Sequence, residues 1–476
     1  MDKGFGEAYL AKRRIPAIHF ISKDNHWWQT PEPWEAFEVL RARGLLSPDR
    51  QITLYGSSMG GYAALRFSAA LRPRRVVVFS PQYSIDSRRV PFEKRWRSYA
   101  GKLDFRFDEM EGAIDPAAEV FVIFDPLFRP DALHVQKFEE HRPLERVAIP
   151  FAGHNTARFL SEIGAIGEVT ETLLDGTFDL AAFRRTYRRE RQTAALFWHG
   201  LAEALAEHRR PAASAIAAVV AARVLEAFGR MRDRTLHLDI LHAGLAAAAS
   251  AGRLPQASAW LKEIRRLDGN SARTAVAASL VARAAGDSGS ALRSAEAALA
   301  RRPGDASVVA LVARCLAEGG DPQAALGLIE RQPAKLQGVA PLLLARGRAE
   351  AALGRWEAAK ATLRRFCGLD RHDAEARFLL ALSWAETGRP DGVRVQLQPV
   401  LQGAFVDARL ASSVISLLYT AGEAEQGRLA QQRQETFTRV CDIVFSDPPA
   451  EWGRDPLRDI VRLRERIRTA VRDASV

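Results

Sequence analysis

A serine lies in a glycine-rich turn between a predicted strand and a predicted helix. The turn reads Gly56-Ser57-Ser58-Met59-Gly60; the apolar residues 52–55 precede it and the alanine-rich residues 62–67 follow it. In a strand–turn–helix of the form Gly-x-Ser-x-Gly, the flanking positions must lack bulk and the serine hydroxyl is lifted clear of the sheet. Ser58 is therefore the candidate nucleophile, and a plain glycine-rich turn is the alternative interpretation.

A serine nucleophile needs a base, and the base needs an acid that orients it. Of the ten histidines, only His154 follows the end of a late predicted strand, within the sequence Gly153-His154. An imidazole at that place can reach over the edge of the sheet toward Ser58. The other histidines lie in predicted strands or helices, beside a helix, or among tryptophans, where a packed or solvated ring is the default. His154 is the predicted base.

Two aspartates compete for the role of the acid. The predicted strand 120–124 ends at Asp125, and Asp131 follows six residues later, just before a helix predicted to begin at Ala132. The acid of such a triad lies between serine and histidine in the chain, and a place a few residues beyond the strand favours Asp131. Asp131 would otherwise only cap the helix, and Asp125 would only open an Asp-Pro turn. Both stay candidates.

These motifs give residues 5 to about 175 a resemblance to the α/β-hydrolase fold, a parallel sheet flanked by helices. The resemblance implies a serine hydrolase of the esterase, lipase or acyl-transfer type, with Ser58 as nucleophile, His154 as base and one of the two aspartates as acid. The substrate would be a small acyl ester or an acylated molecule, and no cofactor or metal is implied. The backbone N–H of Met59 would supply one donor to the oxyanion.

The same resemblance implies a strand whose loop supplies the second oxyanion donor. The sequence opens instead on a predicted helix over residues 5–12 and a predicted strand over residues 15–21, which matches the strand after the missing one. We expect either that the missing strand lies upstream of Met1 or that the sheet is rebuilt around the gap. Trp27 and Trp28 then follow, either lining an acyl or sugar pocket or packed in a loop. A short lid-like helix is predicted within residues 88–102.

Glycines recur with a period of 34 residues in the second half of the chain. They stand at positions 252, 286, 320, 354, 388 and 422. Five residues after each glycine comes a small or nearly small residue: Ala257, Ala291, Ala325, Ala359, Val393 and Gly427. A glycine in the turn between paired helices and a small residue where they cross are typical of the tetratricopeptide repeat. Residues 236–440 therefore resemble an array of about six such repeats, which predicts a peptide or protein partner.

The predicted organisation has four parts. Residues 1–177 form the α/β domain and residues 178–235 a helical linker or N-terminal cap. The array, an all-α solenoid, covers residues 236–440, and residues 441–476 form a capping helix and tail. The cap matters because stacked repeats bury a core only against their neighbours.

Composition narrows the classes of partner and compartment. The formal charge is +11 and the isoelectric point about 9.9, but the arginines are interspersed with acids, and even the dense cluster at residues 184–191 contains Glu190. This pattern favours solvated helices over a nucleic-acid surface. Three well-separated cysteines predict a reducing cytoplasm without disulfides or zinc. No apolar stretch approaches the roughly 20 residues of a membrane span, and the opening residues predict no signal peptide.

Three functions therefore compete. The first is a cytoplasmic serine hydrolase with an appended protein-interaction array. The second is an interaction scaffold whose hydrolase half is degenerate, because the oxyanion strand is missing. The third is an acyltransferase that uses the same triad to pass an acyl group to a sugar or an alcohol.

Overall fold

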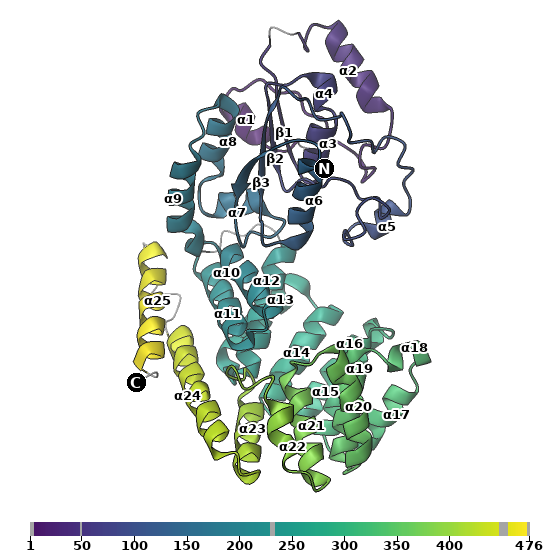
Figure 1. The fold of residues 1–476 in the computed structure, drawn as a ribbon, viewed down its shortest axis with the longest axis vertical. Helices are drawn as coiled ribbons and strands as arrows, with labels where there is room; N and C mark the ends of the chain where they lie inside the picture. The colour runs from purple at the N-terminus through teal and green to yellow at the C-terminus, as the bar shows by residue number, and fades with distance from the viewer. Residues whose placement is uncertain (1–3, 48–49, 229–233, 447–455, 474–476) are drawn as a thin grey trace. The chain divides into compact units, whose positions relative to one another are not determined.

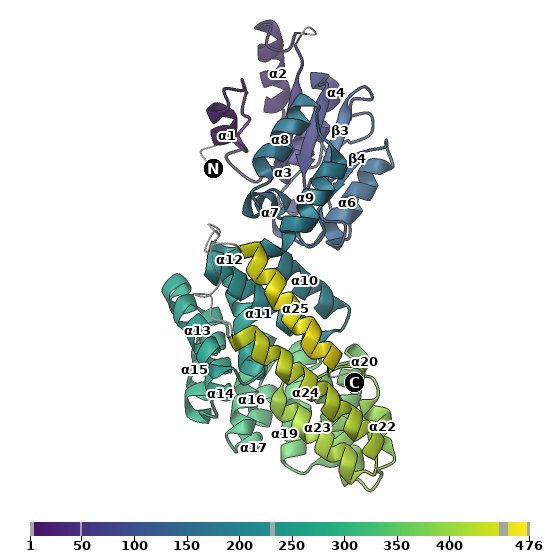
Figure 2. The same cartoon turned by 90° about the vertical axis from the view of Figure 1, so that its left-hand side faces the viewer.

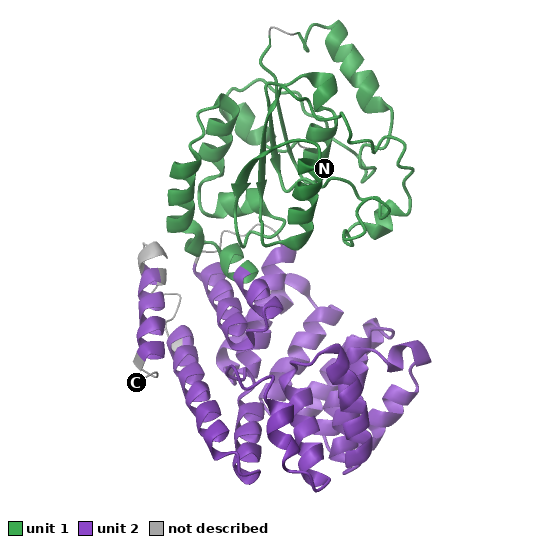
Figure 3. Ribbon diagram, in the orientation of Figure 1, with its two compact units in different colours: residues 1–200 green, residues 201–476 purple. Residues whose placement is uncertain are grey.

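The computed structural model describes residues 4–47, 50–228, 234–446 and 456–473. The chain divides into two compact units, residues 1–200 and residues 201–476 (Figure 3). The division falls within α10 (Ala195–Glu207). The sequence placed the end of the first domain at residue 177, ahead of α9 (Leu180–Glu190), which lies here in the first unit.

A four-stranded parallel sheet forms the centre of the first unit (Figure 1). The strands, in the spatial order β1-β2-β3-β4, are β1 (Thr53–Ser57), β2 (Arg75–Phe79), β3 (Glu119–Phe124) and β4 (Glu145–Ala148). The register sets Gly56 opposite Val78 and Val78 opposite Val122. Because all strands run in one direction, the segments that follow β1, β3 and β4 all lie at the carboxyl ends of the strands, here called the carboxyl edge of the sheet.

Helices cover both faces of this sheet (Figures 1 and 2). The helices before and within the first unit's sheet are α1 (Glu7–Lys12), α2 (Glu32–Ala42), α3 (Met59–Arg66), α4 (Ser68–Leu71), α5 (Arg97–Ala100) and α6 (Arg129–Glu139), and those after it are α7 (Thr156–Glu162), α8 (Ile166–Asp175), α9 and the short η1 (Arg191–Thr193). Val78 of β2 packs in one core with Leu65 of α3 and Phe138 of α6, while α8 packs against β2 from the opposite side (Figure 1). This double cover explains why β2 is an uninterrupted buried apolar run after Arg75.

The strand predicted over residues 15–21 was wrong, because the structure has no regular element there. Pro16 lacks the N–H that a sheet ladder needs, and Ile18 and Phe20 are 53% and 42% exposed rather than packed. Consequently β1 lies at the edge of the sheet among the described residues. The helix predicted over residues 5–12 corresponds to α1.

The second unit consists of paired helices whose connecting turns contain the periodic glycines. The pairs are α12 (Arg234–Ser250) with α13 (Leu254–Asp268), α14 (Ala272–Ala284) with α15 (Ser288–Arg301), α16 (Ala306–Glu318) with α17 (Pro322–Glu330), α19 (Ala340–Ala352) with α20 (Trp356–Leu369), α21 (Ala374–Glu386) with α22 (Gly392–Leu397), and α23 (Ala408–Thr420) with α24 (Ala424–Ser446). A further short helix, α18 (Ala334–Gln337), precedes α19. Every one of the six glycines has a positive φ, between 68° and 95°, which is the left-handed conformation that ends a helix most easily at glycine.

The small residues of the period are buried where the helices of the array pack against one another. Ala257, Ala325, Ala359 and Val393 are fully buried, and Ala291 is 1% exposed. A small side chain lets the partner helix approach closely, so these positions set the spacing within each pair. The repeat pattern inferred from the sequence thus corresponds to the observed helical pairs.

The last repeat helix returns to the start of the second unit (Figures 1 and 2). There α24 contacts α11 (Pro211–Phe228), the helix before the first repeat. Arg223 of α11 donates to the backbone carbonyl of Phe445 at 3.2 Å, and Arg253 pairs with Asp442. Val219 of α11 and Val444 of α24 line the same small apolar pocket.

A final helix, α25 (Pro456–Asp473), packs against α24. The three cysteines, Cys315, Cys367 and Cys441, are buried free thiols. No helix in the described part of the chain is long and apolar enough to cross a membrane.

Candidate active site

Ser58 lies at the end of β1 in a strained turn. Its backbone φ is 54° and ψ is −119°, a conformation that residues other than glycine rarely adopt and that concentrates at functional sites. Its N–H donates to the carbonyl of Phe79 at 2.9 Å, which ties the turn to β2. A Cβ at Gly56 would lie 2.3 Å from the carbonyl oxygen of Gly60, whereas one at Gly60 would meet nothing within 4 Å. The steric demand for glycine therefore falls on position 56 and not on position 60.

His154 lies in the loop after β4 and reaches Ser58. Its Nε2 is 3.0 Å from Ser58 Oγ, and its Nδ1 is 2.8 Å from Asp131 Oδ2. The imidazole side chain is 23% exposed, while Asp131 is fully buried. The structure thus brings three of the predicted residues into one hydrogen-bonded chain, Ser58–His154–Asp131, at the carboxyl edge of the sheet.

The two aspartates have different places in this geometry. Asp131 lies in the first turn of α6, which begins at Arg129 rather than at Ala132, and its carboxylate turns to His154 instead of capping the helix. Asp125 accepts the N–H groups of Leu127 and Gly153, each at 2.8 Å. Burial raises the pKa of Asp125 to about 6, against the opposing effect of these N–H donors. Asp125 therefore anchors the loop that carries His154, and Asp131 contacts the imidazole.

A buried ion-pair cluster lies behind Asp131. Arg95 Nη2 donates to Asp131 Oδ1 at 3.0 Å and to Glu93 Oε2 at 2.6 Å. Glu93 in turn lies 3.0 Å from Nε2 of His134. Burial alone would raise the pKa of Glu93, but the hydrogen bonds from His134 and Arg95 outweigh it and lower the pKa to about 2. Burial lowers the pKa of His134, so the ring is neutral near pH 7.

Sequence reasoning missed this cluster. Arg95 and Glu93 lie in the segment 88–102 that was predicted to contain a short helix, and α5 is that helix. His134 was among the histidines expected to be simply packed or solvated. It follows Asp131 by three residues, however, a spacing that places both side chains on one face of α6. That shared face was the one signal in the sequence, while nothing in it pointed to Arg95.

Gln82, which the sequence analysis also passed over, lies between Ser58 and His154. This fully buried residue follows β2. Its Oε1 is 3.2 Å from Ser58 Oγ, and its Nε2 is 3.2 Å from His154 Nε2. The amide thus contacts the side chains of both Ser58 and His154.

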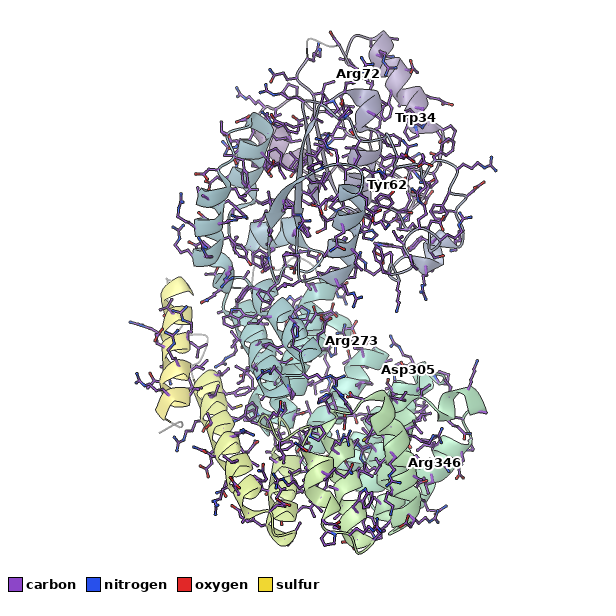
Figure 4. All side chains as sticks on the ribbon, in the orientation of Figure 1. Trp34, Tyr62, Arg72, Arg273, Asp305 and Arg346 are labelled. Carbon is purple, nitrogen blue, oxygen red and sulfur yellow. The ribbon has the colours of Figure 1, made fainter. Side chains whose placement is uncertain are left out.

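The two adjacent tryptophans are packed rather than open to solvent. Trp27 is 2% exposed and Trp28 is 9% exposed, and both have a positive φ. Trp28 Nε1 donates to the carbonyl of Met59 at 3.1 Å, and Trp27 packs edge-to-face against Tyr62, a residue of α3 labelled in Figure 4. This arrangement supports the packed-loop interpretation. The hydrogen bond from Trp28 also holds Met59, the residue that follows the candidate nucleophile.

No group of three His, Cys, Asp or Glu side chains that could hold a metal ion occurs in the described ranges.

Comparison with known proteins identifies one part of the chain. Residues 282–349 match the family model of the tetratricopeptide repeat. These residues run from the end of α14 to α19 and include two of the periodic glycines, Gly286 and Gly320. No curated protein matches the chain. The array is thus supported by sequence family and by structure, whereas the chemistry of the first unit depends on its geometry.

Proposed function

We propose that the first unit is a serine hydrolase of the carboxylic-ester type and that the repeat array binds a protein partner. The observation that carries the proposal is the hydrogen-bonded chain from Ser58 through His154 to the buried Asp131. Along the chain the serine comes first, then the acid and then the base, which is the order typical of α/β-hydrolases. The strained backbone of Ser58 is the second support. This conformation costs free energy in a residue other than glycine, and such strain is concentrated at functional sites.

The geometry suits acyl transfer through a covalent intermediate. Ser58 Oγ would attack the carbonyl carbon of an ester while His154 Nε2 takes the hydroxyl proton. Asp131 Oδ2 accepts the Nδ1–H of His154, which holds the ring in the required tautomer and stabilises the imidazolium. His154 would then return the proton to the departing alcohol, and water would release the acyl group from Ser58 by the reverse sequence.

Met59 is the candidate oxyanion donor. As the first residue of α3, it has an N–H without an acceptor inside the helix, and the helix N-terminus favours negative charge. Trp28 fixes the same residue from its carbonyl side. The substrate class that fits is a small acyl ester or an acylated molecule.

A second candidate function is a protein-interaction scaffold with an inactive first unit. The observation that favours it is the position of β1 at the edge of the sheet among the described residues. In the fold that the motifs resemble, a strand on the far side of the nucleophile strand leads to the second oxyanion donor. The tetratricopeptide match supports a protein-binding role under both candidates. Location in the cytoplasm stays a prediction, with which the three free thiols agree.

A covalent serine probe separates the candidates. The full chain, treated with a fluorophosphonate, should be labelled, and Ser58→Ala should abolish labelling. Ser57→Ala is the matched control, because Ser57 is the neighbouring residue in β1 and contacts neither His154 nor Asp131 in the described structure. A folded chain that resists the probe would favour the scaffold. Product analysis with added alcohol against water alone then separates hydrolysis from acyl transfer.

A further inference from the structure

The acid of the proposed triad is held by a single guanidinium nitrogen. Arg95 Nη2 donates both to Asp131 Oδ1 and to Glu93 Oε2. Asp131 thus uses one oxygen for His154 and the other for Arg95. The two carboxylates are essentially inaccessible, with side chains 0% and 1% exposed, and the Arg95 side chain is 26% exposed.

Arg95 is itself held in place by Glu93 and by Phe128. Its Nε and Nη2 both bond to the carboxylate of Glu93, the planar two-point contact that a guanidinium makes and an ammonium does not. Its guanidinium carbon lies 5.3 Å from the ring centre of Phe128, the residue before α6. The side chain has little freedom to leave Asp131.

His134 fixes the far end of the cluster. Its Nδ1 accepts the backbone N–H of Tyr83 at 3.1 Å, so the proton of the neutral ring lies on Nε2 and is donated to Glu93. The backbone after β2 therefore orients His134, His134 orients Glu93, and Glu93 orients Arg95. The chain of contacts ends at Asp131.

The charges of the cluster also suit the proposed reaction. Asp131 and Glu93 contribute two carboxylates, Arg95 contributes one guanidinium, and His134 is neutral. The cluster thus carries a formal excess of one negative charge. When His154 takes the proton of Ser58, its imidazolium compensates that excess beside the two buried carboxylates.

We propose that Arg95 is a positioning residue of the reaction, which holds Asp131 in line with His154 and is itself held by Glu93 and His134. This inference rests on the proposed function, because the alignment matters for catalysis only if His154 activates Ser58. Arg95 acts through Asp131 and does not touch Ser58 or His154.

Replacing Arg95 by Met removes the nitrogen from which both carboxylates accept. Two buried carboxylates side by side do not both stay ionised readily. Whichever carboxyl takes up a proton, Asp131 Oδ1 has lost its partner, and Oδ2 is no longer fixed opposite His154 Nδ1. A displacement of about 1 Å at such a place costs about 10²-fold in rate.

A double-mutant cycle on the full chain tests the inference. The rate of fluorophosphonate labelling is measured for wild type, Arg95→Met, Asp131→Asn and the double variant. We expect Arg95→Met alone to slow labelling about 10²-fold and to add little in the Asp131→Asn background. Arg88→Met is the matched control: this 78% exposed arginine pairs with Asp86 in the same segment, and its removal should leave the rate unchanged.

Two further measurements keep the result interpretable if Arg95→Met unfolds. Arg95→Lys retains the charge without the planar fork and should label at an intermediate rate. Arg95→Ala should regain labelling when guanidinium ion is added at concentrations well below those that unfold the protein. Equal slowing by Arg95→Met in both backgrounds, or labelling of a folded Arg95→Met at the wild-type rate, would overturn the positioning role.

Nuclear magnetic resonance of the histidine ring protons distinguishes failure of this inference from failure of the proposed function. The Nδ1–H of His154 should be protected from exchange with solvent in wild type and in Arg88→Met, and it should lose protection in Arg95→Lys. If wild type resists the probe while this pattern holds, the hydrolase proposal fails and Arg95 still positions Asp131. An unchanged Nδ1–H signal in Arg95→Lys and Arg95→Met would refute the positioning role directly.

Discussion

Gly56→Ala should strongly slow the reaction of Ser58, the proposed nucleophile, although it adds only one methyl group. The added Cβ would lie 2.3 Å from the carbonyl oxygen and 2.5 Å from the carbonyl carbon of Gly60, both backbone atoms of the first turn of α3. Ordinary contact begins at about 3.4 Å, so the turn must open by about 1 Å. Backbone cannot swing aside as a flexible side chain would, and Ser58 lies between the two glycines.

The displacement sets two magnitudes. Overpacking of this kind destabilises a fold by about 1–3 kcal/mol, and moving a reacting atom by about 1 Å lowers the rate about 10²-fold. Gly60→Ala is the control, because a Cβ there meets nothing within 4 Å and alanine is the better helix former by up to about 1 kcal/mol.

The assay combines labelling and unfolding. Fluorophosphonate labelling rates and urea midpoints are measured for both variants and for wild type. We expect slow labelling and a lower midpoint for Gly56→Ala, with Gly60→Ala much closer to wild type in both. Equal rates for Gly56→Ala and wild type would show that the turn yields without moving Ser58, and equal losses in both variants would remove the steric explanation.

Three further predictions address the acid, the pH dependence and the array. Asp131→Asn should slow labelling by about 10²- to 10⁴-fold through the lost imidazole tautomer. Asp125→Asn should mainly lower the free energy of unfolding, by about 1–3 kcal/mol, as measured by urea unfolding; the reverse result would exchange the two roles. Glu162 at the end of α7 accepts the N–H of Leu196, and burial raises its pKa from 4.5 to about 7. The folded state therefore holds this proton more tightly than the unfolded chain. The contribution of Glu162 to stability is fully present below about pH 4.5 and is lost as the pH rises through about 7, by up to about 3 kcal/mol. Glu162→Gln should abolish this fall, which urea unfolding at several pH values measures, and an unchanged pH dependence would contradict the assignment. Ala359→Trp should destabilise the second unit by about 1–3 kcal/mol or more, because Ala359 is fully buried at a helix crossing; circular dichroism melting reports this, and loss of Ser58 labelling in the same variant would mean that the two units unfold together.

The neighbouring positions of Ser58 and His154 were predictable because they follow from rules that act locally. Gly56 is required by the tight turn after β1, and a histidine in the loop that follows the last strand of a parallel sheet can reach its carboxyl edge, as His154 does after β4. The sequence favoured Asp131 over Asp125 but left both as candidates, since the choice depends on α6 beginning at Arg129, a boundary that side-chain patterns fix only within a few residues. Only the folded loop shows that Asp125 turns toward backbone donors.

Two other features lay outside the reach of sequence patterns. The cluster around Arg95 joins a loop, a helix and the end of a strand, and such contacts leave no periodic signal. The segment 15–21 is apolar enough to suggest a strand, but a strand forms only where a neighbour offers hydrogen bonds, and Pro16 weakens that pairing further. The array, by contrast, was predictable from the sequence. The positive φ of Gly354 and the burial of Ala359 have counterparts in each helical pair, so glycine and small residues recur with a regular period.

The return of α24 to α11 changes how the second unit should lose structure. In an open stack of repeats, each end has a neighbour on one side only, and the ends fray first. Here the Arg223 contact with Phe445 and the pairing of Arg253 with Asp442 join the two ends. To open any one place, the unit must then break two interfaces instead of one, which makes its unfolding more cooperative than the number of repeats suggests. Slow amide exchange should therefore extend into α11 and the last turns of α24. A fragment that begins at residue 236 lacks α11 and should lose that protection in the last turns of α24.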